Sequence, residues 1–112
     1  MIIEISDNFC ILTPVCADLN ITESNKIFKF IKNENKRVGV DLSNICSFSY
    51  FFIENLIKTA KIKSISLFNI PDDLFVLFNT MNTGKTVDLF VNDIDFRENS
   101  RKLINRQFSV VD

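Results

Sequence analysis

The sequence predicts a single α/β domain with a central mixed β-sheet of about five strands and about four helices. Its 112 residues match the commonest size of one domain. Hydrophobic residues make up 46% of the chain, enough for a core, and two Gly and two Pro leave little room for long loops. After two initial strand patterns, strand and helix patterns alternate. This order is typical of parallel strands joined by helices that pack on the sheet.

The chain begins with a predicted β-hairpin. Residues Met1–Ser6 are apolar and β-branched, and the pair Asp7 and Asn8 forms a turn. Residues Phe9–Val15 form the second strand, with Pro14 marking its edge or end. We therefore expect these two strands to pair with each other.

A first helix follows the connection Ala17–Ile21. Thr22 can cap its start, and the helix ends in the polar run Asn33–Asn35. Its apolar residues share one face and three lysines lie on another, as expected for a helix that packs on a sheet. The apolar residues are Ile27, Phe28, Phe30 and Ile31.

The stretch Arg37–Ala60 organises the predicted fold. Residues Arg37–Leu42 form a buried strand, Ser43–Ser49 a turn, and Ser49–Ala60 a second helix with apolar residues at helical spacing. A strand that leads directly into a helix forms a junction where α/β domains present polar groups to partners or ligands. This junction is therefore the first place to look for a functional site.

The rest of the chain continues the alternation. Residues Ser64–Phe68 form a fourth strand, Pro71 signals the start of a third helix, and Gly84 its end. A fifth strand is predicted at Val87–Val91, and a last helix opens at Asp93. Its expected apolar positions are Ile94, Phe96, Leu103, Ile104 and Phe108, and its expected solvated face is Arg97, Glu98, Arg101, Lys102 and Arg106. The predicted order is β-β-α-β-α-β-α-β-α.

Charge and hydropathy limit the classes of partner. The formal charge is −1, from 13 basic and 14 acidic residues spread fairly evenly along the chain. A protein that binds nucleic acid through phosphate contacts needs a basic face, so we expect no nucleic-acid partner. No apolar run approaches the length of a membrane span, and the N-terminus lacks the pattern of a signal peptide. We therefore expect a cytoplasmic protein that does not bind membranes.

Few residues favour catalysis or metal binding. The chain has no histidine, the side chain that titrates near neutral pH. Its cysteines, Cys10, Cys16 and Cys46, lack metal-ligand spacing and are expected to be small buried residues. Asp41 lies at the end of a strand without a second carboxylate nearby in sequence, so we expect it to bond the turn backbone. We expect no enzymatic activity, no metal site and no cofactor.

The junction resembles a known family. The run Asp41–Ile45 (DLSNI) followed by a helix, within the predicted order of elements, is similar to the STAS domain, the fold of bacterial anti-sigma factor antagonists. The resemblance covers nearly the whole chain. Apolar positions of the family pattern are occupied here by Ile45, Phe48, Ile53, Leu56 and Ile57.

The resemblance also points to a changed regulatory switch. In STAS domains an Asp, a phosphorylatable Ser, a Ser or Thr and a Gly start the second helix. A phosphate there adds a charge of about −2 and disrupts docking to a kinase-like anti-sigma factor. The corresponding residues here are Ser49, Tyr50, Phe51 and Phe52. Tyr50 thus occupies the phosphoacceptor position, which implies that the usual phosphoserine switch is missing.

Three hypotheses on function follow. The first is a protein-interaction module that binds a kinase-like anti-sigma factor or another regulator through the start of the second helix. Four successive large side chains cannot all face one side of a helix, so Tyr50 or Phe51 should be exposed, and an exposed aromatic patch would also allow a homodimer. The expected contact residues are Ser47, Ser49, Tyr50, Phe51 and Glu54, with Ser49 also capping the helix.

The other two hypotheses use different features of the chain. In the second, the protein is an anti-sigma factor antagonist that is phosphorylated at a shifted serine, Ser47 or Ser49. In the third, an interior rich in phenylalanine, with 12 Phe in the chain, holds a small molecule or a lipid.

Overall fold

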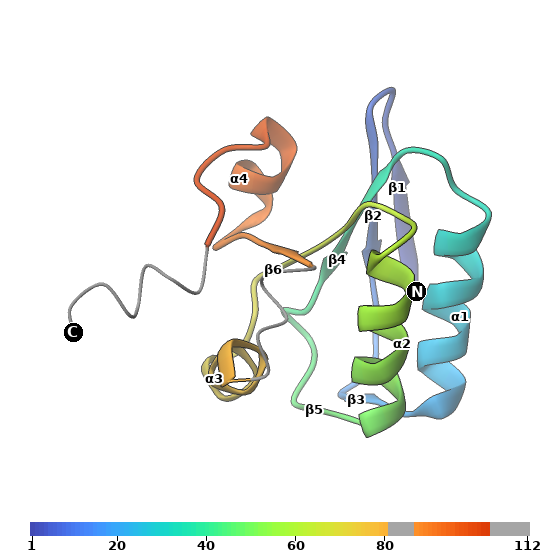
Figure 1. The fold of residues 1–112 in the computed structure, drawn as a ribbon, viewed down its shortest axis with the longest axis vertical. Helices are drawn as coiled ribbons and strands as arrows, with labels where there is room; N and C mark the ends of the chain where they lie inside the picture. Colours follow the sequence, from blue (N-terminus) through green and yellow to red (C-terminus); the bar gives the residue numbers. More distant parts are fainter. Residues whose placement is uncertain (81–86, 104–112) are drawn as a thin grey trace.

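The computed structural model describes residues 1–80 and 87–103, and these residues form an α/β fold with a five-stranded mixed sheet and four helices (Figure 1). The predicted fold class is therefore confirmed. In chain order the elements are β1 (Ile2–Ile5), β2 (Phe9–Thr13), β3 (Asp18–Leu19), α1 (Ile21–Lys32), β4 (Arg37–Asp41), β5 (Ser47–Phe48), α2 (Tyr50–Ala60), β6 (Ile65–Phe68), α3 (Asp72–Thr80), β7 (Asp88–Leu89) and α4 (Asp93–Glu98).

The strands of the main sheet lie in the order β1-β2-β4-β6-β7. β1 pairs antiparallel with β2, which confirms the predicted hairpin, and all the other neighbours are parallel. The connections from β2 to β4, from β4 to β6 and from β6 to β7 each lead to the next strand of the sheet in the same direction. Because such parallel connections are right-handed, their helices α1, α2 and α3 lie on one face of the sheet. Buried residues of these three helices form a single core cluster with residues of the sheet, and α1 and α2 lie side by side (Figure 1).

α4 covers the opposite face of the sheet. Phe96 of α4 is fully buried and stacks on Phe68 with 5.3 Å between ring centroids, while Phe90 meets it edge-on at 5.9 Å. Gly39 of β4 lies directly below these rings. A Cβ atom at Gly39 would lie 2.7 Å from Phe96 Cζ and 2.9 Å from Phe68 Cε1, so the absence of a side chain lets the rings approach the sheet.

Arg37 and Arg97 fasten α4 to the sheet. The Arg37 guanidinium lies 4.3 Å from the centroid of the Phe96 ring and donates hydrogen bonds to the carbonyl oxygens of Phe96 and Arg97. Burial lowers the pKa of Arg37. The Arg97 guanidinium donates to both carboxylate oxygens of Glu4, at 2.6 and 2.7 Å, and thereby ties α4 to β1.

The last helix is much shorter than the sequence pattern predicted. It ends at Glu98 because Asn99 adopts a left-handed conformation with φ 52° and caps the helix, a role that Asn fills readily. Leu103 lies beyond it in an isolated antiparallel bridge with Leu89. Ile94 is exposed, so its expected place in the core is also wrong. Gly84, Ile104, Arg106 and Phe108 lie outside the described residues.

The start of α1 differs from the prediction, whereas α4 begins at Asp93 as predicted. The side chain of Asn20 caps α1 by accepting from the backbone N–H of Glu23 at 2.9 Å, in place of Thr22. Asn92 caps α4 in the same way by accepting from Asp95 N–H. Asparagine side chains reach the free N–H groups of a first turn well, so Asn20 is as favourable a cap as the predicted Thr22.

We expect Gly39→Ala to destabilise the protein by about 1–3 kcal/mol because the new methyl group would overlap the rings of Phe96 and Phe68. Thermal unfolding of the purified variant measures this loss. In a Phe96→Leu background the same substitution should cost clearly less, because the smaller side chain leaves room for the methyl group. An equal cost in both backgrounds would contradict this account of Gly39.

The Glu4–Arg97 pair predicts a pH dependence. The hydrogen bond from Arg97 holds the pKa of the Glu4 carboxyl below its usual range. A carboxyl whose pKa is lower in the folded state stabilises the fold above its unfolded pKa, and this contribution disappears as the pH falls through the folded value. Because Glu4 is exposed, the contribution is small.

An NMR titration of the Glu4 side-chain carboxyl carbon should show a pKa below the usual range of a glutamate side chain. Arg97→Ala should move this pKa back toward the ordinary value. Arg101→Ala is the matched control, because Arg101 pairs with Asp95, and it should leave the Glu4 titration unchanged. A Glu4 pKa that does not respond to Arg97→Ala would refute the assigned pairing.

Candidate functional site

The candidate site is built from two loops that the structure holds together. The loop after β2 carries β3, the loop after β4 carries β5, and these two short strands pair in parallel beside the starts of α1 and α2 (Figure 1). The backbone N–H of Cys46 donates to the Ala17 carbonyl oxygen at 2.7 Å, and Ser49 N–H donates to the Leu19 carbonyl oxygen at 2.9 Å. Sequence patterns did not predict this second sheet.

The paired loops rest on buried aromatic rings. Phe48 of β5 is half-buried, with its ring 6.4 Å from Phe52 of α2 and 5.7 Å from Phe78 of α3 between centroids. Leu19 of β3 is fully buried. The Asn44 side-chain amide adds a bond between the loops by donating to the Pro14 carbonyl oxygen at 3.2 Å. Apolar packing below and hydrogen bonds across the loops therefore fix the position of the α2 start.

Ser49 caps α2 as the sequence predicted. It has an extended backbone, and its hydroxyl oxygen accepts from the Phe52 N–H at 3.3 Å. Of the four successive large side chains that follow, Tyr50 is 68% exposed, Phe51 is half-buried, and Phe52 and Ile53 are buried. The expectation that at least one aromatic side chain at this junction is exposed is confirmed.

The other predicted contact residues also lie at the surface. Ser47 is exposed, and its hydroxyl donates to Asp18 Oδ1 at 2.8 Å. Glu54 is exposed one helical turn after Tyr50, so the two side chains share a face of α2. The structure thus leaves Ser47, Tyr50 and Glu54 accessible, with Tyr50 and Glu54 on one face of α2, while Ser49 and Phe51 are half-buried.

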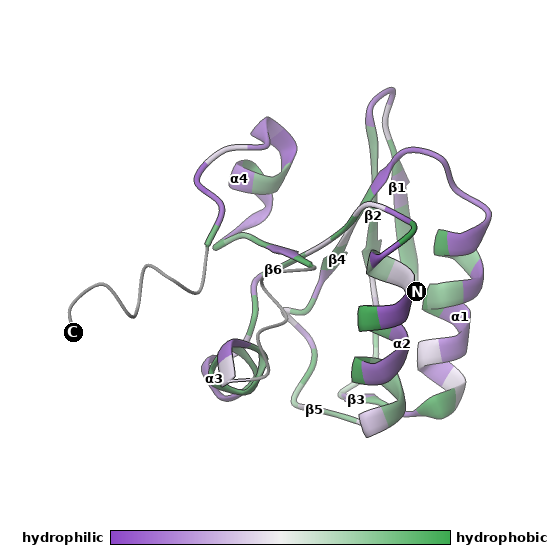
Figure 2. Cartoon of the chain, viewed as in Figure 1, coloured by the Kyte–Doolittle hydropathy of each residue, from purple (hydrophilic) through white to green (hydrophobic). Residues whose placement is uncertain are grey.

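Sequence reasoning missed two apolar members of this surface. Val15 and Ile21 are each more than half exposed, and they flank the loop that pairs with β5. For Ile21 the available signal was an apolar residue in the predicted connection Ala17–Ile21, whereas Val15 was included in the predicted strand Phe9–Val15, which ends at Thr13 in the structure. We define the paired-loop surface as the exposed residues Val15, Ile21, Ser47 and Tyr50. The opposite end of the sheet carries the polar turns at residues 7–8 and 33–36, which are hydrophilic in Figure 2.

Asp41 has the structural role expected for it. Its Oδ1 accepts from the Ser43 backbone N–H at 3.0 Å and from the Asn69 side-chain amide at 3.2 Å.

Burial raises the pKa of the Cys10 and Cys16 thiols, which keeps them protonated and weakly nucleophilic. Cys46 is exposed, so the expectation that all three cysteines are buried is wrong. Within residues 1–80 and 87–103, no three His, Cys, Asp or Glu side chains form a group that could hold a metal ion.

The phenylalanine side chains that a ligand would have to contact fill the core instead. Phe52, Phe68, Phe78, Phe90 and Phe96 are at most 1% exposed. Each of them contacts at least one other ring, such as Phe28 against Phe52 at 5.6 Å. Packing therefore accounts for these rings without a bound small molecule or lipid.

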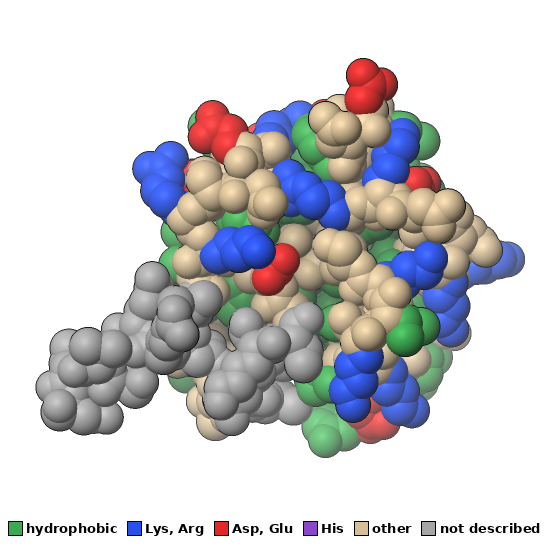
Figure 3. All heavy atoms as spheres, turned by 45° about the horizontal axis from the view of Figure 1, so that its top comes forward, with side chains coloured by type: hydrophobic (Ala, Val, Ile, Leu, Met, Phe, Trp, Pro, Cys, Tyr) green, Lys and Arg blue, Asp and Glu red, His purple; other side chains and the backbone are tan. Residues whose placement is uncertain are grey.

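Surface charge adds no further candidate site on the visible face. On the face shown in Figure 3, Lys and Arg side chains lie at several separate places, with acidic side chains between some of them. None of the helices in the described part of the chain is long and apolar enough to cross a membrane.

Comparison with models of known protein families finds no family that matches this chain, and comparison with curated proteins finds no match either. The resemblance to the STAS domain therefore rests on Asp41–Ile45 and on the order of elements. Membership of that family stays a prediction.

Proposed function

We propose that this chain is a STAS-like, non-enzymatic module that binds a protein partner through the paired-loop surface. The observation that carries the proposal is Tyr50, an aromatic side chain 68% exposed on the first turn of a well-anchored helix. Aromatic side chains are prominent among the residues that dominate binding energy at protein interfaces. A ring that is mostly in water adds little to folding, so its contribution is expected in a complex.

The support around Tyr50 favours binding. The capping bond of Ser49 and the bond from Ser49 N–H to the Leu19 carbonyl oxygen fix the backbone immediately before it. A partner therefore meets a surface whose main chain is already ordered, which reduces the entropy lost on association.

The composition of the surface agrees with a protein contact. Val15 and Ile21 add exposed apolar area on either side of β3, which pairs with β5, and Ser47 and Glu54 supply exposed polar groups. Protein–protein interfaces likewise combine apolar and polar side chains. The STAS resemblance suggests a kinase-like anti-sigma factor or another regulator as the partner, in a cytoplasmic setting.

We expect Tyr50→Ala to weaken partner binding at least tenfold, about 1.4 kcal/mol, and to change the free energy of unfolding by no more than about 0.5 kcal/mol. The partner is first identified by affinity capture of the tagged chain from its own cells and then purified for calorimetric titration. Ile62→Ala is the matched control, because Ile62 is an exposed apolar residue just past the other end of α2.

Three outcomes decide between the readings of Tyr50. Loss of binding with unchanged stability, and full binding by Ile62→Ala, supports the proposal. Equal losses of binding and stability would make Tyr50 a packing residue. Binding unaffected by Tyr50→Ala, or capture of no stoichiometric protein by the wild-type chain, would refute the proposed interaction surface.

For the second hypothesis, phosphorylation at a shifted serine, Ser47 is the more accessible of the two candidate residues. Its exposed hydroxyl lies 2.8 Å from Asp18 Oδ1, whereas the Ser49 hydroxyl is half-buried in the helix cap. A phosphate on Ser47 would remove the hydrogen bond and repel the Asp18 carboxylate. Such a change would loosen β3 from β5 and alter the paired-loop surface.

For this second hypothesis we expect phosphate on Ser47 and none on Ser49 when protein from its own cells is mapped by mass spectrometry. Ser47→Asp should also speed hydrogen exchange of the Ser49 N–H, which bonds to Leu19 across the paired loops. Ser43→Asp, at an exposed serine of the same loop, is the control. Unmodified Ser47 together with unchanged exchange would remove the hypothesis.

A further inference from the structure

A second surface lies at the free edge of the main sheet. Within the described residues β1 pairs with β2 alone, so its other edge presents unpaired backbone groups. Its apolar side chains are open to solvent: Ile2 is 61%, Ile3 43% and Ile5 64% exposed. An apolar strand edge of this kind is a ready template for another strand.

The usual protections against such pairing are weak in β1. Edge strands are commonly guarded by Lys, by Pro or by a charge that points toward the edge. The sequence of β1, IIEI, contains neither Lys nor Pro. Its one charge, Glu4, is bound at both carboxylate oxygens by Arg97 of the same chain, so it repels an approaching strand less than a free carboxylate would.

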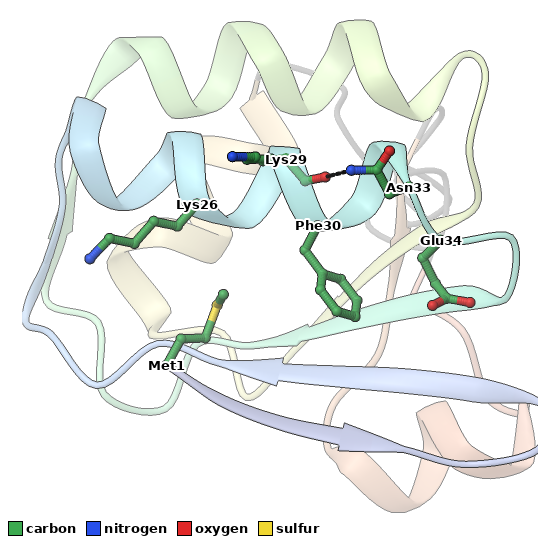
Figure 4. Close-up of a pocket in the computed structure, with 6 residues that line it drawn as sticks. All are labelled: Met1, Lys26, Lys29, Phe30, Asn33 and Glu34. Carbon is green, nitrogen blue, oxygen red and sulfur yellow. Dashed lines mark hydrogen bonds between the residues drawn. The ribbon is translucent and has the colours of Figure 1, made fainter.

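A groove lies between α1 and Met1, the residue that precedes this strand, on the α1 side of the sheet. Met1 points from the strand toward α1, and Phe30 points from α1 toward the strand (Figure 4). The groove has a volume of about 380 Å³. Lys26 and Lys29 lie toward its Met1 end, and Glu34 lies toward its other end (Figure 4). The groove is thus apolar along its floor, basic at one end and acidic at the other.

We propose that β1 pairs antiparallel with β1 of a second copy of this chain, which joins the two sheets into one. Ile3 and Ile5 stand opposite Leu12 and Cys10 of β2, two core residues on the α1 side, so they point to that side. A two-fold axis at Ile3 places Ile3 opposite itself and Met1 opposite Ile5 of the second copy. The row of apolar side chains then continues across both copies.

Charge disfavours the register with its axis at Glu4 and suits a second copy as the partner. With the axis at Ile3, Glu4 lies opposite Ile2 of the second copy, whereas an axis at Glu4 would set two carboxylates opposite each other. The axis also reverses the second copy, so the Lys26 and Lys29 end of one groove lies toward the Glu34 end of the other. Backbone hydrogen bonds between the strands supply affinity, and the matched ends supply specificity.

Sedimentation equilibrium of the full chain tests the association. We expect the wild type to show twice the mass of one chain and Ile3→Lys, which sets two like charges opposite each other at the axis, to raise the dissociation constant at least tenfold. Ile62→Lys introduces the same charge just past the end of α2 and should leave the dimer intact. Circular dichroism checks that each variant is folded.

A single-chain mass at every concentration up to the solubility limit would overturn the proposal, as would a dimer that Ile3→Lys leaves unchanged. Tyr50→Ala should keep the dimer, because Tyr50 lies on the paired-loop surface and not on β1. The dimer and the proposed partner site can therefore fail independently of each other.

Cysteine cross-linking tests the register. In a Cys46→Ser background, Ile3→Cys should form a disulfide-linked dimer on mild oxidation, because directly opposite Cα atoms lie about 4.5–5.5 Å apart, within disulfide range. Ile5→Cys is the control: Ile5 is the more exposed of the two residues, yet this register keeps its two copies far apart. Cross-linking of Ile5→Cys as fast as Ile3→Cys would reject the pairing.

Discussion

The approach of Phe96 to Gly39 decides how the sheet is covered. Parallel strands in the middle of a sheet need cover on both faces, and the three crossover helices all occupy one of them. The short helix α4 must cover the other with very few residues. It does so with one large ring packed against Phe68 and Phe90, and this is sterically allowed because β4 has no side chain at Gly39.

With both faces covered, the sheet remains accessible at its ends and edges. The loops that follow the carboxyl ends of β2 and β4 pair through β3 and β5, and Tyr50 is exposed just after β5. At the β1 edge it leaves a short apolar strand without a neighbour among the described residues. The two proposed contact surfaces therefore arise from one property of a small α/β domain: its helices cover the two faces of the sheet and leave ends and edges open.

Hydrophobic periodicity was enough to predict the hairpin, the buried strand β4 and the helix α2. It could not reveal β3 and β5, because strands of two residues have no period. The last helix was predicted too long because its charged spacing fits a helix, while Asn99 reverses the backbone locally. At the site, the exposure of Tyr50 followed from four adjacent large side chains. The exposure of Val15 and Ile21 depended on how two distant loops meet.

At the start of α2, one residue caps the helix and another offers a contact to a partner. Ser49 supplies the cap that holds the helix, and Tyr50 supplies the exposed group that a partner can contact. A phosphate at such a position adds charge that can be removed again, whereas an aromatic ring is permanent. The control proposed at Ser47 would act on the loops that support Tyr50 and not on the ring itself. The Ser47–Asp18 hydrogen bond is exposed and joins the two loops, which makes it an accessible point for that control.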